Sequence, residues 1–112
     1  MTTLHHGSHC STTTAHEGQC WTDDNSAAEH YAAGGTVTTV TVDLSALVVE
    51  RCAGYSWDDN YAPADDAAFR AAAAARGVDV LRYSDADDRG QEHTCYRLVS
   101  DRAVAAFATV AA

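Results

Sequence analysis

Polar side chains that could do chemistry gather in three clusters against an alanine-rich background. The first cluster is residues 4–8, Leu-His-His-Gly-Ser, where the glycine lets a ligand approach the backbone closely. The second is residues 18–23, Gly-Gln-Cys-Trp-Thr-Asp, which lead into a segment that carries Tyr31. The third is residues 83–98, in which several acids lie close together in the chain. These acids are Asp85, Asp87, Asp88 and Glu92.

The elements that must position these clusters follow from local sequence patterns. Alternating β-branched residues and short apolar runs predict strands. These strands cover residues 2–6, 20–22, 36–44, 46–52, 78–84 and 91–99. Runs of strong helix formers predict helices over residues 25–33, 63–76 and 101–107, although the last segment can instead finish as a strand. Polar loops are expected over residues 8–19, 54–62 and 85–90.

The first helix has both a start and a stop signal. Asp23, Asp24 or Asn25 can cap its first turn, and Gly34–Gly35 stands where helices commonly end. Ser100 can cap the last helix in the same way. The sequence therefore predicts that the helix bearing Tyr31 begins directly after the second cluster.

The order of elements indicates the fold class. A strand and a helix are followed by several strands, a second helix and a hairpin, which is an α+β plan with a mostly antiparallel sheet and two to three short helices. The chain has 112 residues, which suit one core, and it shows no internal repeat and no linker. We expect a single domain over residues 1–112.

The charge balance excludes some partners. The chain has 16 acids against 7 bases and a net charge of −9. Such a surface repels phosphate backbones, so we expect no direct nucleic-acid binding and no anionic-membrane binding. The ordinary explanation is that the acids keep a small protein in solution.

The cysteines and the N-terminus bear on location and on metal binding. The first residues have no basic region followed by an apolar run, and no apolar stretch approaches the ~20 residues that span a bilayer. We expect a cytoplasmic protein whose four cysteines are reduced. Histidines and cysteines crowd the first 20 residues, but their spacing is not that of a zinc site, so no metal is expected.

Taken in order, the three clusters resemble the His–Tyr–Glu branch of the ADP-ribosyltransferase superfamily. The matching pieces span nearly the whole chain, and each is weak alone. They are His6-Gly7-Ser8, then Cys20-Trp21-Thr22-Asp23 with Ala28-Glu29-His30-Tyr31-Ala32, then Gln91-Glu92-His93-Thr94. The resemblance implies an ADP-ribosyltransferase-like split sheet and NAD as co-substrate.

The resemblance also implies roles for single residues. Gly7 backbone groups would hold the nicotinamide carboxamide, Tyr31 would stack on its ring, and His6 would bind the adenosine-side ribose. Glu92 is the expected catalytic carboxylate, because a carboxylate stabilises the oxocarbenium-like state formed when the nicotinamide–ribose bond breaks. Asp85 is the second candidate for that role. The remaining expected NAD-binding residues are Ser8, Trp21 and Thr22.

Within the family, the late segment is most similar to a compact phage-encoded branch that includes an anti-CRISPR enzyme. The match lies in Tyr83-Ser84-Asp85 before the turn. The resemblance therefore implies a protein acceptor, which a phage protein could find in a subunit of a host CRISPR complex. Gly90 stands two residues before Glu92, where arginine-modifying relatives carry Glu or Gln, so an arginine acceptor is not expected.

Two other functions remain open from the sequence. One is a non-catalytic acidic binding protein that mimics the charge of nucleic acid, which a net charge of −9 permits. The other is an NAD hydrolase toxin without a protein acceptor. Each site residue also has an ordinary structural explanation: Tyr31 as a core aromatic, His6 as a strand histidine, Glu92 as a solvent-facing edge residue.

Overall fold

The computed structural model describes residues 1–8, 15–52, 63–86 and 89–111, and the expected loop over 54–62 lies outside them. The α+β plan is confirmed, with three α-helices and six strands in this part of the chain. The strands are β1 (Thr2–Ser8), β2 (Cys20–Thr22), β3 (Thr36–Val42), β4 (Val49–Arg51), β5 (Val80–Ala86) and β6 (Glu92–Leu98). The helices are α1 (Asn25–Ala32), α2 (Pro63–Ala75) and α3 (Asp101–Ala111), with a short 3₁₀ turn η1 (Leu44–Ala46).

The six strands form one mixed sheet in the order β3-β1-β2-β6-β5-β4. Neighbouring strands run antiparallel except β4 and β5, which are parallel. Unlike the expected split sheet, the pairing is continuous across the described strands. However, β1 meets β2 at a single register pair, His5 with Thr22, whereas β1 pairs with β3 along its whole length. The shortest strand pairing in the sheet is therefore that between β1 and β2, which carry the first two clusters.

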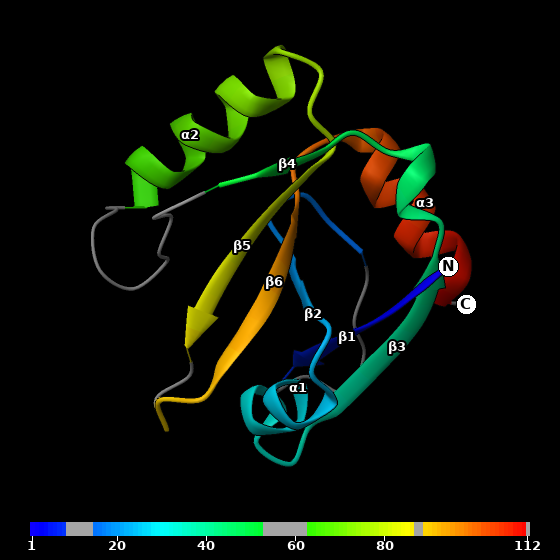
Figure 1. Cartoon of the computed structure of the whole chain (residues 1–112), viewed down its shortest axis with the longest axis vertical. Coiled ribbons are helices and arrows are strands. Elements are labelled where there is room, and N and C mark those ends of the chain that lie inside the picture. Colours follow the sequence, from blue (N-terminus) through cyan, green and yellow to red (C-terminus); the bar gives the residue numbers. More distant parts are fainter. Residues whose placement is uncertain (9–14, 53–62, 87–88, 112) are drawn as a thin grey trace.

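The helices cover both faces of this sheet, and α2 and α3 lie on opposite sides of β5 and β6 (Figure 1). The main core lies on the α3 face, where Phe107 of α3 packs against Trp21 with their ring centroids 5.2 Å apart. Alternation along the strands puts Leu81 and Tyr83 on the other face, where Ala73 of α2 joins Leu81 in a second cluster. Both faces are thus buried around the middle of the sheet.

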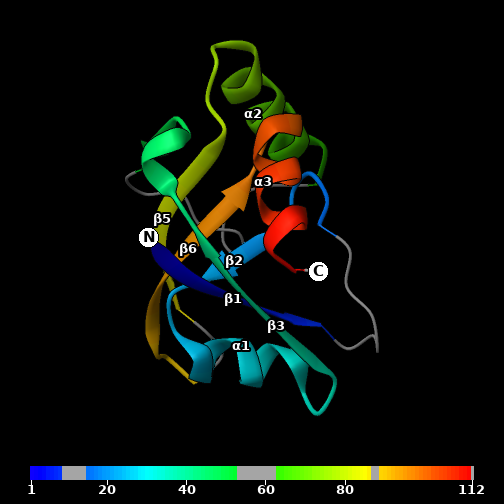
Figure 2. The ribbon, with the colours of Figure 1, turned by 90° about the vertical axis from the view of Figure 1, so that its right-hand side faces the viewer.

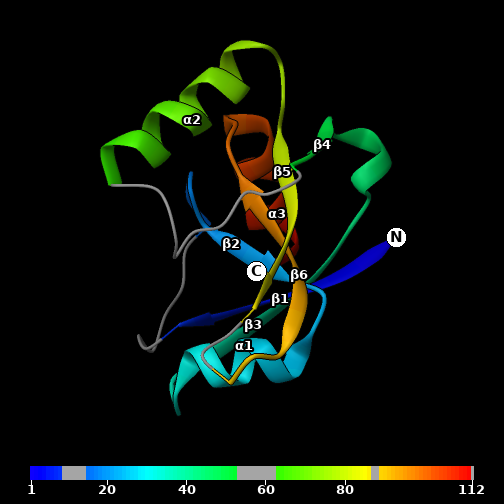
Figure 3. The same ribbon diagram turned by 60° about the vertical axis from the view of Figure 1, so that its left-hand side comes forward.

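Helix α1 lies at the lower end of the sheet, next to β1 and β3, and the β5–β6 hairpin reaches down to it (Figures 2 and 3). Asp24 caps the helix, because its carboxylate accepts the backbone N–H groups of Ser26 and Ala27. The helix ends one residue earlier than expected. Ala33, with φ 48°, takes the left-handed position, and Gly34 follows it.

Gly7 fixes how close α1 can come to the sheet. A Cβ atom on Gly7 would lie 2.0 Å from the carbonyl oxygen of Ala28 and 2.9 Å from the backbone nitrogen of Ala32. Because the obstacle is helix backbone, no side-chain rotation relieves it. The glycine of the first cluster is therefore required for packing of α1 on β1, whatever else it does.

Several helix and strand boundaries differ from those expected from the sequence. The end of the chain is helical as far as Ala111, so the alternative of a final strand is wrong. Ser100 caps this helix as expected, since its Oγ accepts the N–H of Ala103 at 3.0 Å. The turn η1, which Asp43 caps, takes in Leu44 of the expected strand over 36–44 and Ala46 of the run over 46–52, and only Val49–Arg51 of that run pairs as a strand. Strand β5 extends to Ala86, so the backbone of Asp85 lies within it and not in the turn.

Asp79 joins three of these elements just before β5. Its buried carboxylate accepts the N–H of Val48 at 2.8 Å and the hydroxyl of Ser100 at 2.7 Å, and it forms an ion pair with Arg102. Burial alone raises the pKa of Asp79, but the bonds from Arg102, Ser100 and Val48 outweigh it, so the pKa lies below its ordinary value. Asp79 therefore acts as an ionised anchor between β4, β5 and α3.

Candidate functional site

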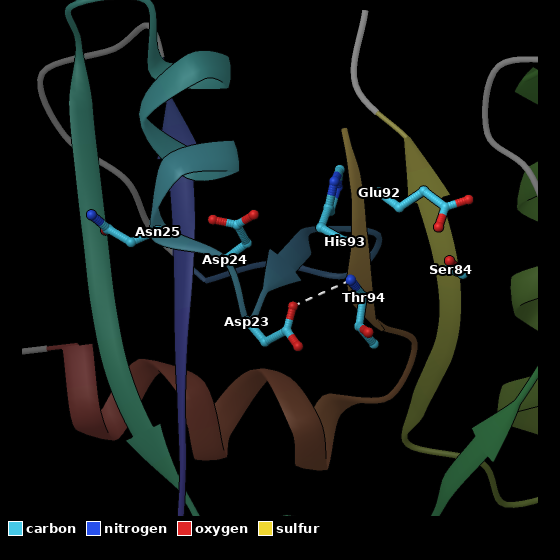
Figure 4. A pocket seen from close by; sticks show the side chains of 7 residues that line it. All are labelled: Asp23, Asp24, Asn25, Ser84, Glu92, His93 and Thr94. Atoms are coloured by element: carbon cyan, nitrogen blue, oxygen red, sulfur yellow. Dashed lines mark hydrogen bonds between the residues drawn. The ribbon is translucent and has the colours of Figure 1, made fainter. Parts of the chain in front are cut away.

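An open, polar depression of about 520 Å³ lies where the start of α1 meets the β5–β6 hairpin (Figure 4). Its lining includes three carboxylates and no Lys or Arg. The lining residues are Asp23, Asp24, Asn25, Ser84, Glu92, His93 and Thr94. Parts of the second and third clusters of the sequence thus meet in one place.

Asp23, which ends the second cluster, and the adjoining Asp24 hold the wall of this depression together. The Oδ1 atom of Asp23 accepts the backbone N–H of Thr94 at 3.2 Å, and this bond is drawn in Figure 4. The N–H of Asp23 donates in return to the carbonyl of Thr94 at 3.4 Å. The hydroxyl of Thr22, which is itself buried, accepts the N–H of Asp24 at 3.1 Å. These bonds dock the start of α1 onto β6.

Glu92 is an exposed carboxylate of the depression, as Asp23 is. It begins β6, where it pairs with Ala86, and no hydrogen bond from the described residues reaches its side chain. Asp85, the second catalytic candidate, lies in β5 opposite His93 in the register. The two candidates therefore stand on neighbouring strands, one residue apart in register.

His93 lies between the depression and Tyr31. The side chain of His93 is buried, with 6% exposed, and neither ring nitrogen has a hydrogen-bond partner among the described residues. The ring of Tyr31 meets it edge-on, with centroids 5.8 Å apart and planes at 71°. Tyr31 is 42% exposed, so the expectation of a purely core aromatic is wrong. Through His93, the structure brings Tyr31 and Glu92 to the same end of the sheet.

His6 lies on the opposite face of the sheet. Its ring packs against Trp21 at 5.5 Å, on the side of the main core, and its Nδ1 atom lies 2.8 Å from the carbonyl oxygen of Cys20. Because a carbonyl only accepts, Nδ1 carries the proton and Nε2 is the acceptor in the neutral ring. Burial lowers the pKa of His6, although the bond to Cys20 acts against this, so the ring is neutral at pH 7.

Other residues of the first two clusters have mainly structural environments. Trp21 is only 1% exposed, and its indole N–H donates to the Oε1 atom of Gln19 at 2.9 Å. Its side chain therefore has almost no surface left for a ligand. Thr22 is 5% exposed, while Ser8, at the end of β1, is half-buried and pairs with Thr36 of β3. None of His6, Gly7, Ser8, Trp21 or Thr22 lines the depression.

Sequence reasoning missed His93 as a candidate, although it lies in the Gln-Glu-His-Thr piece of the third cluster. Alternation along β6 carries the signal that could have found it. Glu92 starts the strand, so the next residue points to the other face, as Cys95 and Arg97 do in the buried part of the same strand. A histidine at such an inward position needs hydrogen-bond partners.

A second buried polar cluster lies further up the sheet. Arg97, 5% exposed, donates from Nε and Nη2 to the hydroxyl of Tyr83 at 3.2 and 2.9 Å. The Sγ atom of Cys20 lies 3.6 Å from the same hydroxyl, and burial raises the pKa of Tyr83 far above its ordinary value. Arg97 and Tyr83 are buried in this cluster, and the hydroxyl of Tyr83 accepts hydrogen bonds that the buried guanidinium must make.

The described residues also bear on metal binding and on membrane spanning. Cys20 and Cys52 are half-buried and Cys95 is buried, and no three His, Cys, Asp or Glu side chains of the described ranges are grouped so as to hold a metal ion. His9 and Cys10, which belong to the histidine- and cysteine-rich first 20 residues, lie outside those ranges. None of the described helices is long and apolar enough to cross a bilayer.

The site therefore stands on its geometry: an exposed glutamate, a buried histidine and an exposed tyrosine at one end of the sheet. Comparison of the chain with protein-family models, with curated proteins and with solved structures found no significant match.

Proposed function

We propose that this chain binds NAD and transfers its ADP-ribose to a protein, with Glu92 as the catalytic carboxylate. The observation that carries the proposal is the depression itself. It presents the exposed Glu92 carboxylate on an open surface near the Tyr31–His93 ring pair, and its described lining holds three carboxylates without a basic side chain.

The charge of the depression suits one end of NAD and not the other. The nicotinamide ring of NAD carries a positive charge, and breaking its bond to ribose moves positive charge onto the ribose ring. Carboxylates stabilise both states, and the effect grows where water is excluded. The pyrophosphate is repelled by the same carboxylates, so it must lie away from them. The proposal therefore places the nicotinamide ribose over Glu92.

The aromatic rings add a second element to this proposal. Tyr31 is exposed beside the depression and offers a flat surface for the charged nicotinamide ring, which an aromatic face attracts. His6 fits the proposal less directly, because it packs against Trp21 on the opposite face of the sheet. The geometry thus supports the Glu92–Tyr31 end of an NAD site, while a contact of His6 with the adenosine-side ribose rests on the family resemblance alone.

The acceptor also rests on that resemblance. It is proposed to be a protein, and the similarity to a phage-encoded branch points to a subunit of a host CRISPR complex.

Two successive measurements test the proposal. Calorimetric titration with NAD is expected to give saturable binding. Incubation with labelled NAD and host lysate is then expected to label a protein band. Free ADP-ribose without a labelled band would instead show an NAD hydrolase.

Absence of any NAD binding would favour the acidic binding protein. Its net charge of −9 and the carboxylates of the depression would then serve a basic partner surface.

A further inference from the structure

His93 is a buried histidine whose hydrogen-bonding groups are unused. Both ring nitrogens are shielded from solvent, and neither has a partner among the described residues. A buried polar group without a partner is destabilising, so native proteins keep such a group only where it serves another purpose. His93 belongs to the lining of the depression (Figure 4), and the ring of Tyr31 lies edge-on against it.

The chemistry of the lining restricts the ligand that would complete these bonds. A neutral imidazole has one donor and one acceptor, and a hydroxyl group can satisfy either. The carboxylates of Asp23 and Glu92 accept hydrogen bonds from hydroxyl groups, and the amide of Asn25 does so as well as donating. Phosphates are disfavoured by the charge, and the described residues lack a metal-binding group. A ligand with neighbouring hydroxyls, such as a ribose diol, fits this set.

We propose that His93 is a binding residue for the hydroxyl groups of the nicotinamide ribose, a role that rests on the proposed use of NAD. In the free protein the exposed ring of Tyr31 lies edge-on against His93 and helps to cover it. Binding turns Tyr31 from His93 toward the nicotinamide ring, which uncovers a ring nitrogen for the ribose. His93 thereby holds the sugar at the depression, whose lining also includes the preceding residue, Glu92.

If His93 is a binding residue, replacing it should change Tm and NAD affinity in opposite directions, whereas a purely structural role would lower both. Replacing His93 by Phe keeps an aromatic ring of similar size and removes both unpaired nitrogens. The free protein is then expected to gain stability, with Tm raised by about 4 °C or more. NAD affinity is expected to fall at least about tenfold, the loss of one buried hydrogen bond to a ligand.

The test measures Tm and NAD affinity for the wild type, His93→Phe and His93→Gln. His93→Gln keeps a donor and an acceptor and is expected to retain more affinity than His93→Phe. His16→Phe is the matched control, because His16 is exposed and lies outside the depression. NMR of the labelled His93 ring, with nicotinamide riboside and nicotinamide as probes, shows whether the sugar is the group bound. Its ring-nitrogen signals are expected to report a new hydrogen bond with the riboside only, whereas nicotinamide alone changes at most the ring-current shift that Tyr31 imposes on the ring protons.

The outcomes distinguish this role from the proposed function. If the wild type binds NAD and His93→Phe binds it equally well, the role of His93 is overturned while NAD binding stands. A parallel loss of Tm and affinity in His93→Phe also overturns it, because His93 would then be needed for the fold. If the wild type binds neither NAD nor nicotinamide riboside, the proposed function fails, and the role of His93 with it.

Discussion

Glu92 and His93 are neighbours in the chain but have opposite environments. Glu92 is exposed on the depression, and His93 is 94% buried beneath it, because successive residues of β6 point to opposite faces. The glutamate is free to act on a ligand, while the histidine is held in place by the ring of Tyr31. Neighbouring residues of β6 therefore differ in role: Glu92 is accessible to a ligand, and His93 is buried against Tyr31.

The role of Glu92 predicts a specific loss. Glu92→Gln keeps the size of the side chain but removes the charge that stabilises the oxocarbenium-like state. Turnover of NAD is expected to fall about 100-fold or more, while NAD affinity changes less than about threefold. The measurement is nicotinamide release together with calorimetric titration. Near-normal turnover in Glu92→Gln, with loss in Asp85→Asn, would transfer the catalytic role to Asp85.

Asp79 makes a prediction about stability. Asp79→Asn removes the charge that Arg102 and Ser100 bind, and the free energy of unfolding is expected to fall by roughly 1–3 kcal/mol. Asp101→Asn is the control, because Asp101 is exposed at the start of α3. Urea denaturation of both variants measures the difference. Equal midpoints for the two variants would show that Asp79 is not an anchor.

The same residue sets a pH dependence. The pKa of Asp79 is lowered in the folded protein, so the unfolded chain binds the proton more readily. Its contribution to stability is complete above the ordinary aspartate pKa of about 4 and is lost as the pH falls from that value through the lowered pKa of the folded state. Thermal melts between about pH 3 and pH 6 are expected to show a smaller acid loss in Asp79→Asn than in the wild type. Identical acid profiles would contradict this.

At the scale of elements, the sequence predicted what depends on local signals. The strand over 20–22, the cap of α1 and the antiparallel hairpin of β5 and β6 were all confirmed. The order of strands in the sheet was not predicted, because pairing of β2 with both β1 and β6 joins residues far apart in the chain. Ser45 in the sequence indicates a bend between the runs over 36–44 and 46–52, and η1 lies at that point.

The candidate site was predicted only in part for a related reason. The structure brings Tyr31 and Glu92 to one end of the sheet with His93 between them, whereas His6 packs against Trp21 on the other face. Trp21 is in the core, because its face of β2 is set by the partner strand and not by its motif. Which face a strand residue takes depends on register, and register is a tertiary property.

Helix α1 depends on one glycine of the first cluster. In Gly7→Ala, the added Cβ meets the backbone of Ala28, so α1 must move away from β1. The free energy of unfolding is expected to fall by about 1–3 kcal/mol, and the depression should widen as α1 shifts. Urea denaturation and amide exchange of α1 measure this. Unchanged stability in Gly7→Ala would show that α1 does not pack on β1 as described.

At the scale of the whole molecule, the charge of −9 separates the two main functions by their salt dependence. NAD is negatively charged overall, so added salt screens its repulsion from the protein. Raising the salt from about 50 to about 300 mM is expected to leave NAD affinity unchanged or to tighten it up to about twofold. A charge mimic bound to a basic surface would instead weaken about tenfold or more over that range. Calorimetry at both salt concentrations measures this.

The account as a whole depends on NAD binding at the depression, and one titration tests it most directly. Wild type, Glu92→Gln and His93→Phe are titrated with NAD under the same conditions. Saturable binding is expected for the wild type and for Glu92→Gln, with clearly weaker binding for His93→Phe. No binding of NAD by the wild type protein would contradict the account.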